Sequence, residues 1–166
     1  MTLHRPSNVD ALETLQPIVD ALQSIADRMP VVFVAHPRTI KSLKSFGLHD
    51  PLSAANNVTL LEPLAYVDFM NVVTGAGAVI TDSGGLQEET TYLGIPCLTL
   101  RENTERPVTV TLGTNRLVRA ETLHEELNRV LAGDWPKGER PPLWDGHAAD
   151  RAVESLARQT RRQPKR

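Results

Sequence analysis

The sequence predicts an α/β fold of the Rossmann-like type, in which a parallel sheet is covered by helices on both faces. Apolar runs at residues 31–35 and 97–100 have the continuous hydrophobic character of buried parallel strands. Segments with helical spacing separate such runs, so strands and helices alternate along the chain. A Ser-Gly-Gly turn at residues 83–85 joins another strand to a helix. About six strands follow from this pattern, with a ligand cleft at their carboxyl ends.

Length and composition indicate one globular domain. The chain has 166 residues, of which 40% are hydrophobic and 23% are charged, as is ordinary for a soluble protein. The formal net charge of −2 gives no electrostatic basis for nucleic-acid binding, and no apolar run approaches the roughly 20 residues that span a bilayer. We therefore expect no nucleic-acid partner, no membrane association and a cytoplasmic location. The single cysteine, Cys97, is predicted to be a small buried side chain.

The chain begins inside a predicted strand, and a broken helix follows. Two residues of strand character precede His4 and Arg5, which we expect at the carboxyl end of that shortened strand. Ser7 or Asn8 can cap the next helix, whose apolar positions follow helical spacing. Because Pro17 lacks a backbone N–H, we expect a break there, between a short first helix and a longer second one.

Two strands, each with its helix, come next. Apolar runs and helical spacing predict strands at 31–35 and 58–61, and helices at 38–46 and 65–74. Gly47 is placed to close the first of these helices. His36 follows a strand, so it either lines the cleft or has a structural role. Tyr66 and Phe69 lie three apart on one helix face, where packing in the core is the ordinary interpretation.

The stretch at residues 78–89 is the one around which the rest of the chain is organised. It reads as a strand, a sharp turn at Ser83, Gly84 and Gly85, and a helix start. The free N–H groups of that first turn, with no side chains on the glycines, form a site for phosphate. Glu89, one turn into the helix, can hydrogen-bond sugar hydroxyls. The alternative is a turn that binds nothing, with surface glutamates that match the helix dipole.

The last part of the chain continues the alternation. We expect strands at 97–100 and 116–118, and helices at 86–93, 121–131 and 148–158. Arg101 and Arg106 follow a strand, where they can offer forked donors to phosphate or to a carbonyl oxygen. Alternatively they pair with Glu102 and Glu105. The basic residues from 158 to 166 read as a flexible tail beyond a domain at 1–157.

Several separated motifs resemble the non-hydrolysing UDP-N-acetylglucosamine 2-epimerases. They are Thr-Leu-His-Arg at 2–5, Thr-Asp-Ser-Gly-Gly-Leu-Gln-Glu-Glu at 81–89 and Thr-Glu-Arg-Pro at 104–107. The resemblance covers nearly the whole chain, but only the C-terminal, nucleotide-binding half of such an enzyme, a Rossmann-like domain of the glycosyltransferase B architecture. It implies an isomerase that interconverts UDP-GlcNAc and UDP-ManNAc by eliminating and re-adding UDP. No cofactor is implied, and the five histidines show no metal-ligand spacing.

The resemblance also implies roles for individual residues. His4 is the candidate catalytic residue, and with Arg106 it faces the charge of the departing diphosphate. The backbone near Phe69 holds the uracil ring. The candidate substrate-binding residues are Arg5, Phe69, Ser83, Gly84, Gly85, Glu89, Arg101 and Arg106. Three positions depart from the family pattern, namely Ser7 and Val108, where glutamate is usual, and Arg119, where glycine is common.

Other functions remain open from the sequence. One is the donor-nucleotide-binding domain of a UDP-sugar glycosyltransferase, which shares the fold but not the Thr-Glu-Arg-Pro block. Another is a non-catalytic module that binds UDP-sugars. The acidic catalytic residues of the resembled enzymes lie mostly in the N-terminal half. We therefore expect this chain to bind UDP or UDP-GlcNAc, to be inactive alone, and to have an N-terminal partner half or a second copy as its partner.

Overall fold

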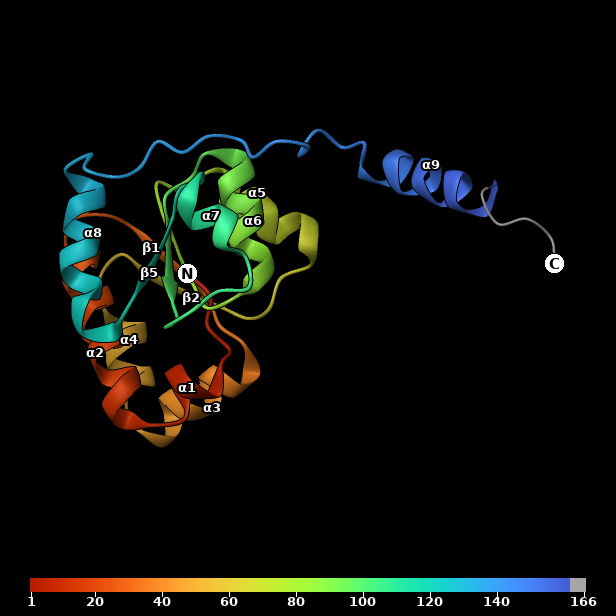
Figure 1. Cartoon of the computed structure of the whole chain (residues 1–166). Helices are drawn as coiled ribbons and strands as arrows, with labels where there is room; N and C mark the ends of the chain where they lie inside the picture. The colour runs from red at the N-terminus through yellow and green to blue at the C-terminus, as the bar shows by residue number, and fades with distance from the viewer. Residues whose placement is uncertain (162–166) are drawn as a thin grey trace.

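The computed structural model describes residues 1–161 and has the predicted α/β architecture (Figure 1). Its strands are β1 (Val31–Val34), β2 (Val58–Leu61), β3 (Val79–Thr81), β4 (Cys97–Leu100) and β5 (Asn115–Val118). Each agrees with a predicted strand to within one residue at either end. Of the predicted basic tail at 158–166, residues 162–166 fall outside the described residues.

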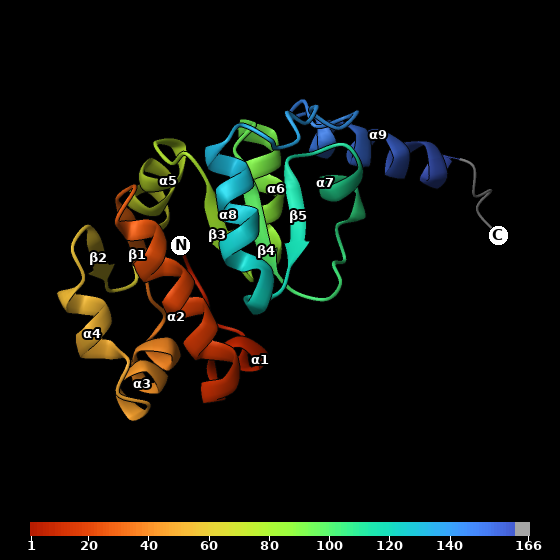
Figure 2. The same ribbon diagram turned by 90° about the vertical axis from the view of Figure 1, so that its left-hand side faces the viewer.

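The strands form one parallel arrangement around the amino-terminal residues. β1 pairs with β2, and β4 lies between β3 and β5, with all neighbours parallel. Residues 1–3 connect these two groups, because Thr2 N donates to Ile80 O (3.0 Å) and Val34 N donates to Met1 O (2.9 Å). Figure 2 accordingly shows the N-terminus between β1 and β3. The order is β2, β1, residues 1–3, β3, β4, β5, so residues 1–3 occupy a strand position, as expected.

Helices cover both faces of this sheet (Figures 1 and 2). They are α1 (Pro6–Val9), α2 (Leu12–Ala26), α3 (Pro37–Ser45), α4 (His49–Ala54), α5 (Tyr66–Thr74), α6 (Gly84–Leu93), α7 (Pro107–Thr111), α8 (Leu123–Leu131) and α9 (Ala148–Arg161), with a 3-10 turn η1 at Ala120–Thr122. α2 and α8 lie together on one face, whereas α6 and α7 lie on the other. Gly94 closes α6 as predicted, with a φ of 72°. The short helices α4 and α7 were not predicted.

The core has a large and a small part. The large part lies between the sheet, α2 and α8, and its most buried side chains include Leu15, Ile18, Leu22, Ile25, Phe33, Leu98 and Leu123. The small part consists of Val73, Val79, Leu86 and Ile95, with Phe69 packed against it. Cys97 is buried, as predicted, and burial raises the pKa of its thiol. The apolar periodicity of α2 therefore identifies the face that holds the domain together.

The break predicted at Pro17 is wrong. Pro17 lies inside α2, and the chain instead breaks at residues 10–11, between α1 and α2. A proline inside a helix removes one backbone hydrogen bond. Leu15 and Ile18, on either side of Pro17, are both buried in the large core, so tertiary packing keeps the helix continuous.

The predicted helix cap at Ser7 or Asn8 is also wrong. Arg5 occupies the N-cap of α1, and Pro6 follows at the first helical position, where its missing N–H is one that the helix would not use. Neither Arg5 nor Ala11, the N-cap of α2, forms a side-chain capping bond. The Asn8 side chain bonds elsewhere, in the candidate functional site.

The last helix, α9, projects away from the domain (Figures 1 and 2). It continues to Arg161, beyond the predicted end at residue 158. Val153 and Leu156 on this helix are 66% and 61% exposed. No helix within residues 1–161 is both long enough and apolar enough to cross a membrane.

Candidate functional site

A cleft of about 360 Å³ opens where the central strands end. It combines segments that follow residues 1–3, β1, β2 and β3, and its lining consists of Thr2, His4, Val34, Ala35, His36, Pro63, Leu64, Tyr66, Phe69, Ser83, Gly85, Leu86 and Glu89. The predicted residues His4, Phe69, Ser83, Gly85 and Glu89 therefore meet in one cavity. Arg5, Gly84, Arg101 and Arg106 are not part of its lining and belong to an adjoining polar network.

The first turn of α6 forms one wall of the cleft. Ser83 is the N-cap residue, in an extended conformation, and its side chain makes no capping hydrogen bond. Its own N–H donates to Thr81 Oγ1 (3.0 Å). A Cβ built on Gly85 would meet no atom within 4 Å, whereas one on Gly84 would lie 3.0 Å from a guanidinium nitrogen of Arg106. The missing side chain of Gly85 thus keeps space open toward the cleft, whereas that of Gly84 leaves room for the Arg106 side chain.

Asp82 fixes the amino-terminal loop to this turn. Its carboxylate is fully buried and accepts hydrogen bonds from His4 N (3.1 Å), Arg5 N (2.9 Å) and Asn8 Nδ2 (3.0 Å). A buried carboxylate needs such donors, because an unpaired one would be strongly destabilised. Sequence reasoning identifies Asp82 only as the end of a strand and misses this role. The available signal is an acidic residue between a buried strand and a glycine turn.

The same carboxylate orients His4. His4 Nδ1 lies 2.9 Å from Asp82 Oδ1, and the His4 side chain is 45% exposed. That contact directs Nδ1 to Asp82 and leaves Nε2 as the ring nitrogen for other contacts. His36, on the neighbouring strand end, also lines the cleft, and its Nδ1 accepts from Arg38 N (3.2 Å) at the start of α3. His36 therefore combines both of the roles considered for it.

Glu89 is paired across the cleft with a tyrosine. Tyr66 Oη donates to Glu89 Oε1 (3.0 Å), and this hydrogen bond raises the pKa of Tyr66, because the carboxylate disfavours a phenolate beside it. Tyr66 is 66% exposed, so core packing is wrong for this residue. Phe69 does pack against the small core cluster while lining the cleft.

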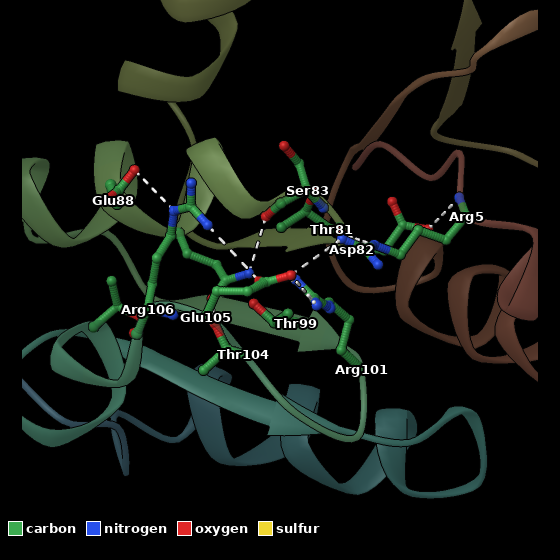
Figure 3. A network of polar contacts seen from close by, with 12 residues as sticks. Arg5, Thr81, Asp82, Ser83, Glu88, Thr99, Arg101, Thr104, Glu105 and Arg106 are labelled. Carbon is green, nitrogen blue, oxygen red and sulfur yellow. Dashed lines mark hydrogen bonds and ion pairs between the residues drawn. The ribbon is translucent and has the colours of Figure 1, made fainter.

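The arginines of the loop after β4 are held by glutamates (Figure 3). Arg101 forms a bidentate pair with Glu105, at 2.8 and 2.9 Å, and these hydrogen bonds lower the pKa of Glu105 to about 2. Arg106 Nε lies 2.9 Å from Glu88 Oε2, although its N–H does not point at that oxygen. Arg5 lies 4.0 Å from Glu105. The alternative in which these arginines pair with glutamates is therefore confirmed for Glu105. The second glutamate is Glu88 and not Glu102.

Buried side chains connect this loop to α6. Thr104 Oγ1 donates to Gln87 Oε1 (2.6 Å), and Asn115 Nδ2 donates to the same oxygen (3.1 Å). Thr99 Oγ1 in turn donates to Asn115 Oδ1 (2.6 Å). Satisfied networks of this kind make a site rigid. No local sequence pattern indicates that Gln87 and Asn115 position the Thr-Glu-Arg-Pro loop.

Comparison with known proteins settles the family. The family model described as UDP-N-acetylglucosamine 2-epimerase matches residues 1–157. The chain belongs to this family. The resemblance inferred from the motifs is thereby confirmed. Among curated members, the UDP-N-acetylglucosamine 2-epimerase of Methanocaldococcus jannaschii is 39% identical over 160 residues, which are 94% of this chain and 43% of that protein.

Other members of the epimerase family differ in the sugar they are named for. The UDP-2,3-diacetamido-2,3-dideoxy-D-glucuronate 2-epimerase of Pseudomonas aeruginosa is 35% identical and is matched over 95% of this chain and 43% of its own length. This chain thus spans less than half the length of these curated relatives. Membership of the family does not by itself identify the sugar.

Solved epimerase structures have the same fold. The M. jannaschii enzyme in complex with UDP-GlcNAc and UDP superimposes with a TM-score of 0.80 at 39% identity, over 95% of this chain and 44% of that one. The Neisseria meningitidis enzyme bound to UDP-GlcNAc gives 0.81 at 31% identity, over 95% of this chain and 43% of its own. The predicted α/β fold with helices on both faces is therefore confirmed.

Proposed function

We propose that this chain is the UDP-binding half of a UDP-N-acetylglucosamine 2-epimerase. The observation that carries the proposal is the first turn of α6, where Gly85 leaves open space beside His4 and Glu89 in one cleft. A helix N-terminus of this kind favours a phosphate. The relatives whose structures contain UDP or UDP-GlcNAc support the choice of nucleotide.

Each part of the nucleotide has a candidate partner in this half. The diphosphate lies on the turn of Ser83, Gly84 and Gly85, with Arg5, Arg101 and Arg106 supplying positive charge beside it. The ribose hydroxyls bind Glu89, which can exchange its hydrogen bond with Tyr66 for one with the sugar. The uracil ring lies against the backbone near Phe69. The diphosphate is thus recognised through charge-assisted hydrogen bonds, and the uracil ring through the shape of its site.

The reaction follows from the chemistry of the substrate. The hydrogen at C2 of UDP-GlcNAc is not acidic, so inversion proceeds by elimination, in which UDP leaves C1 and the C2 hydrogen is removed as a proton. Re-addition of UDP to C1, with a proton returned to the opposite face of C2, then completes the inversion. Preorganised donors lower the barrier by stabilising the charge that develops on the departing diphosphate. We assign that task to His4, which is held by Asp82, and to Arg106. General bases for the sugar come from a partner, which is either the complementary half or a second copy of this chain. We place both in the cytoplasm.

The decisive test is UDP binding to a Gly85→Val variant, measured by calorimetry. Because a Cβ at Gly85 meets nothing within 4 Å, the variant is expected to fold normally and to place its branched side chain in the diphosphate site. We expect UDP affinity to fall by about 2 kcal/mol or more, the cost of losing hydrogen bonds to a charged group. Thr111→Val on the exposed side of α7 is the control and should bind as the parent does. Equal UDP affinity in the Gly85→Val and parent chains would refute the assignment of the diphosphate to this turn.

A further inference from the structure

A second cavity adjoins the cleft at the hydrogen-bonded pair of Tyr66 and Glu89. It holds about 470 Å³, a size typical of small-molecule sites. Its lining comes from α5, α6 and the segment before α9, and consists of Tyr66, Met70, Glu88, Glu89, Tyr92, Leu93, Trp144 and Gly146. Only Tyr66 and Glu89 also line the cleft, so their hydrogen bond lies at the boundary between the two spaces. We call the second space the aromatic cavity.

The walls of the aromatic cavity are mostly apolar. Three aromatic rings, those of Tyr66, Tyr92 and Trp144, come together from separate parts of the chain, and Met70 and Leu93 add aliphatic surface. Tyr66 and Tyr92 are 66% and 47% exposed. Apolar side chains that gather around an exposed hollow, with a few polar groups among them, are typical of a binding site.

Trp144 reaches the aromatic cavity from a turn of unusual conformation. Figures 1 and 2 show the segment between α8 and α9 passing over α6 before α9 begins. Leu143 in this segment has a φ of 70°, in the left-handed region that bulky side chains avoid. Trp144 N donates to Pro141 O (3.2 Å), and Arg151 of α9 donates to Asp145 Oδ1 (2.9 Å). These contacts hold the turn in the shape that places Trp144 beside α6.

The charged groups that line the aromatic cavity are both acidic. Glu88 Oε2 lies 2.9 Å from Arg106 Nε, so the charge of Glu88 is compensated. Glu89 accepts a hydrogen bond from the neutral hydroxyl of Tyr66, and within the described residues it has no cationic partner. A carboxylate beside aromatic faces favours a cation, because the face of an aromatic ring is negative.

One ring of the lining already binds a cation of the chain itself. The guanidinium carbon of Arg140 lies 4.1 Å from the centroid of the Tyr92 ring, a distance at which cation–π attraction is effective. Arg140 is not among the lining residues, so its guanidinium leaves the cavity itself open. The aromatic cavity therefore combines an acceptor of positive charge with rings suited to a cation.

We propose that the aromatic cavity binds a primary ammonium ion with an apolar body, as a second ligand beside the nucleotide. The ammonium group donates to the Glu89 carboxylate, and the apolar body packs against the rings of Tyr92 and Trp144. A carboxylate offers about four acceptor positions, so Glu89 can accept from the ammonium group and from a ribose hydroxyl together. The proposal goes beyond the proposed function, because Tyr92 and Trp144 do not line the cleft.

NMR titration of the full chain, without UDP, tests the ligand class. The probes are phenethylamine, which is a cation at neutral pH, and phenethyl alcohol, which has the same skeleton without the charge. We expect the amine to shift the indole N–H signal of Trp144 and to bind at least about ten-fold more tightly than the alcohol. The indole N–H of Trp135, which donates to Thr114 O outside the aromatic cavity, should not shift. Equal affinities for the two probes, or no shift at millimolar amine, would overturn the proposal.

Two substitutions of Tyr92 provide a matched pair that tests the location. Tyr92→Leu removes the ring and should weaken amine binding about ten-fold, whereas Tyr92→Phe keeps the ring and should bind as the parent does. Equal amine affinity in the two variants would contradict the site. UDP affinity should be unchanged in both, since Tyr92 does not line the cleft. A parent chain that binds UDP but not the amine would refute this inference alone, and one that binds the amine but not UDP would refute the proposed function alone.

Discussion

Glu89 connects the geometry of the cleft to nucleotide recognition at the scale of one residue. Its carboxylate accepts a hydrogen bond from Tyr66 while it lines the cleft. Glu89→Ala should weaken UDP binding by about 1–3 kcal/mol, because a hydrogen bond to a charged group is lost. Calorimetry with UDP measures this. Tyr66→Phe is the matched control, since it leaves the carboxylate in place and should keep UDP affinity. If both variants bind as tightly as the parent, Glu89 is only a surface residue.

Glu105 offers a prediction about pH. Hydrogen bonds from Arg101 lower its pKa to about 2 in the folded chain, whereas an unpaired glutamate titrates near a pKa of about 4.3. A depressed pKa means that the stabilisation is complete at neutral pH and is lost as pH falls from about 4.3 toward 2. In Arg101→Gln the titration midpoint of Glu105, followed by carboxyl NMR, should rise toward the unpaired value. A midpoint that stays at the parent's value would show that the pair does not cause the shift.

The residue scale also shows where sequence reasoning stops. Ser83, Gly85 and Glu89 could be predicted to lie together, because their placement depends on local turn and helix geometry. The role of Asp82 could not, since its partners His4 and Asn8 lie 78 and 74 residues away in sequence. Such contacts depend on which strands become neighbours, and no local pattern in the sequence contains that information.

At the scale of elements, the periodicity of apolar residues predicts which segments form strands and helices that pack together. The strands and, except for α2, the long helices were predicted to within a few residues, whereas α4 and α7, with six and five residues, are too short to show a period. Pro17 shows the opposite failure. A local rule predicted a break, but burial of Leu15 and Ile18 outweighs one missing hydrogen bond.

The packing of α2 gives the prediction at this scale. Leu22 is fully buried in the large core cluster, whereas Leu12 at the start of the same helix is 41% exposed. Leu22→Ala should lower the free energy of unfolding by about 2–5 kcal/mol, the sum of lost transfer energy and a cavity. Urea denaturation measures the change. Leu12→Ala is the matched control and should cost less than about 1 kcal/mol. Similar losses in the two variants would contradict the assignment of the buried face.

At the scale of the whole molecule, the cleft offers few groups for chemistry on the sugar. Its lining in the described residues includes one acidic side chain, Glu89, which we assign to the ribose. Asp82 lies nearby but is buried, and its oxygens are occupied by N–H donors. Elimination and re-addition also need a closed site that holds UDP and the unsaturated sugar together. Residues 1–161 therefore fit the nucleotide side of the proposed reaction, and the proposal assigns the base for C2 to a partner.

We accordingly predict that the isolated chain binds UDP but does not epimerise UDP-GlcNAc. The measurement is deuterium incorporation at C2 of UDP-GlcNAc in heavy water, followed by NMR, with the purified chain alone. No exchange above the protein-free rate is expected, because the cleft formed by the described residues has no carboxylate left over for the sugar once Glu89 binds the ribose. UDP binding in the same preparation shows that the chain is folded and its nucleotide site intact. Exchange that increases with protein concentration and disappears in Glu89→Ala would contradict the prediction, since a base within this half would then suffice.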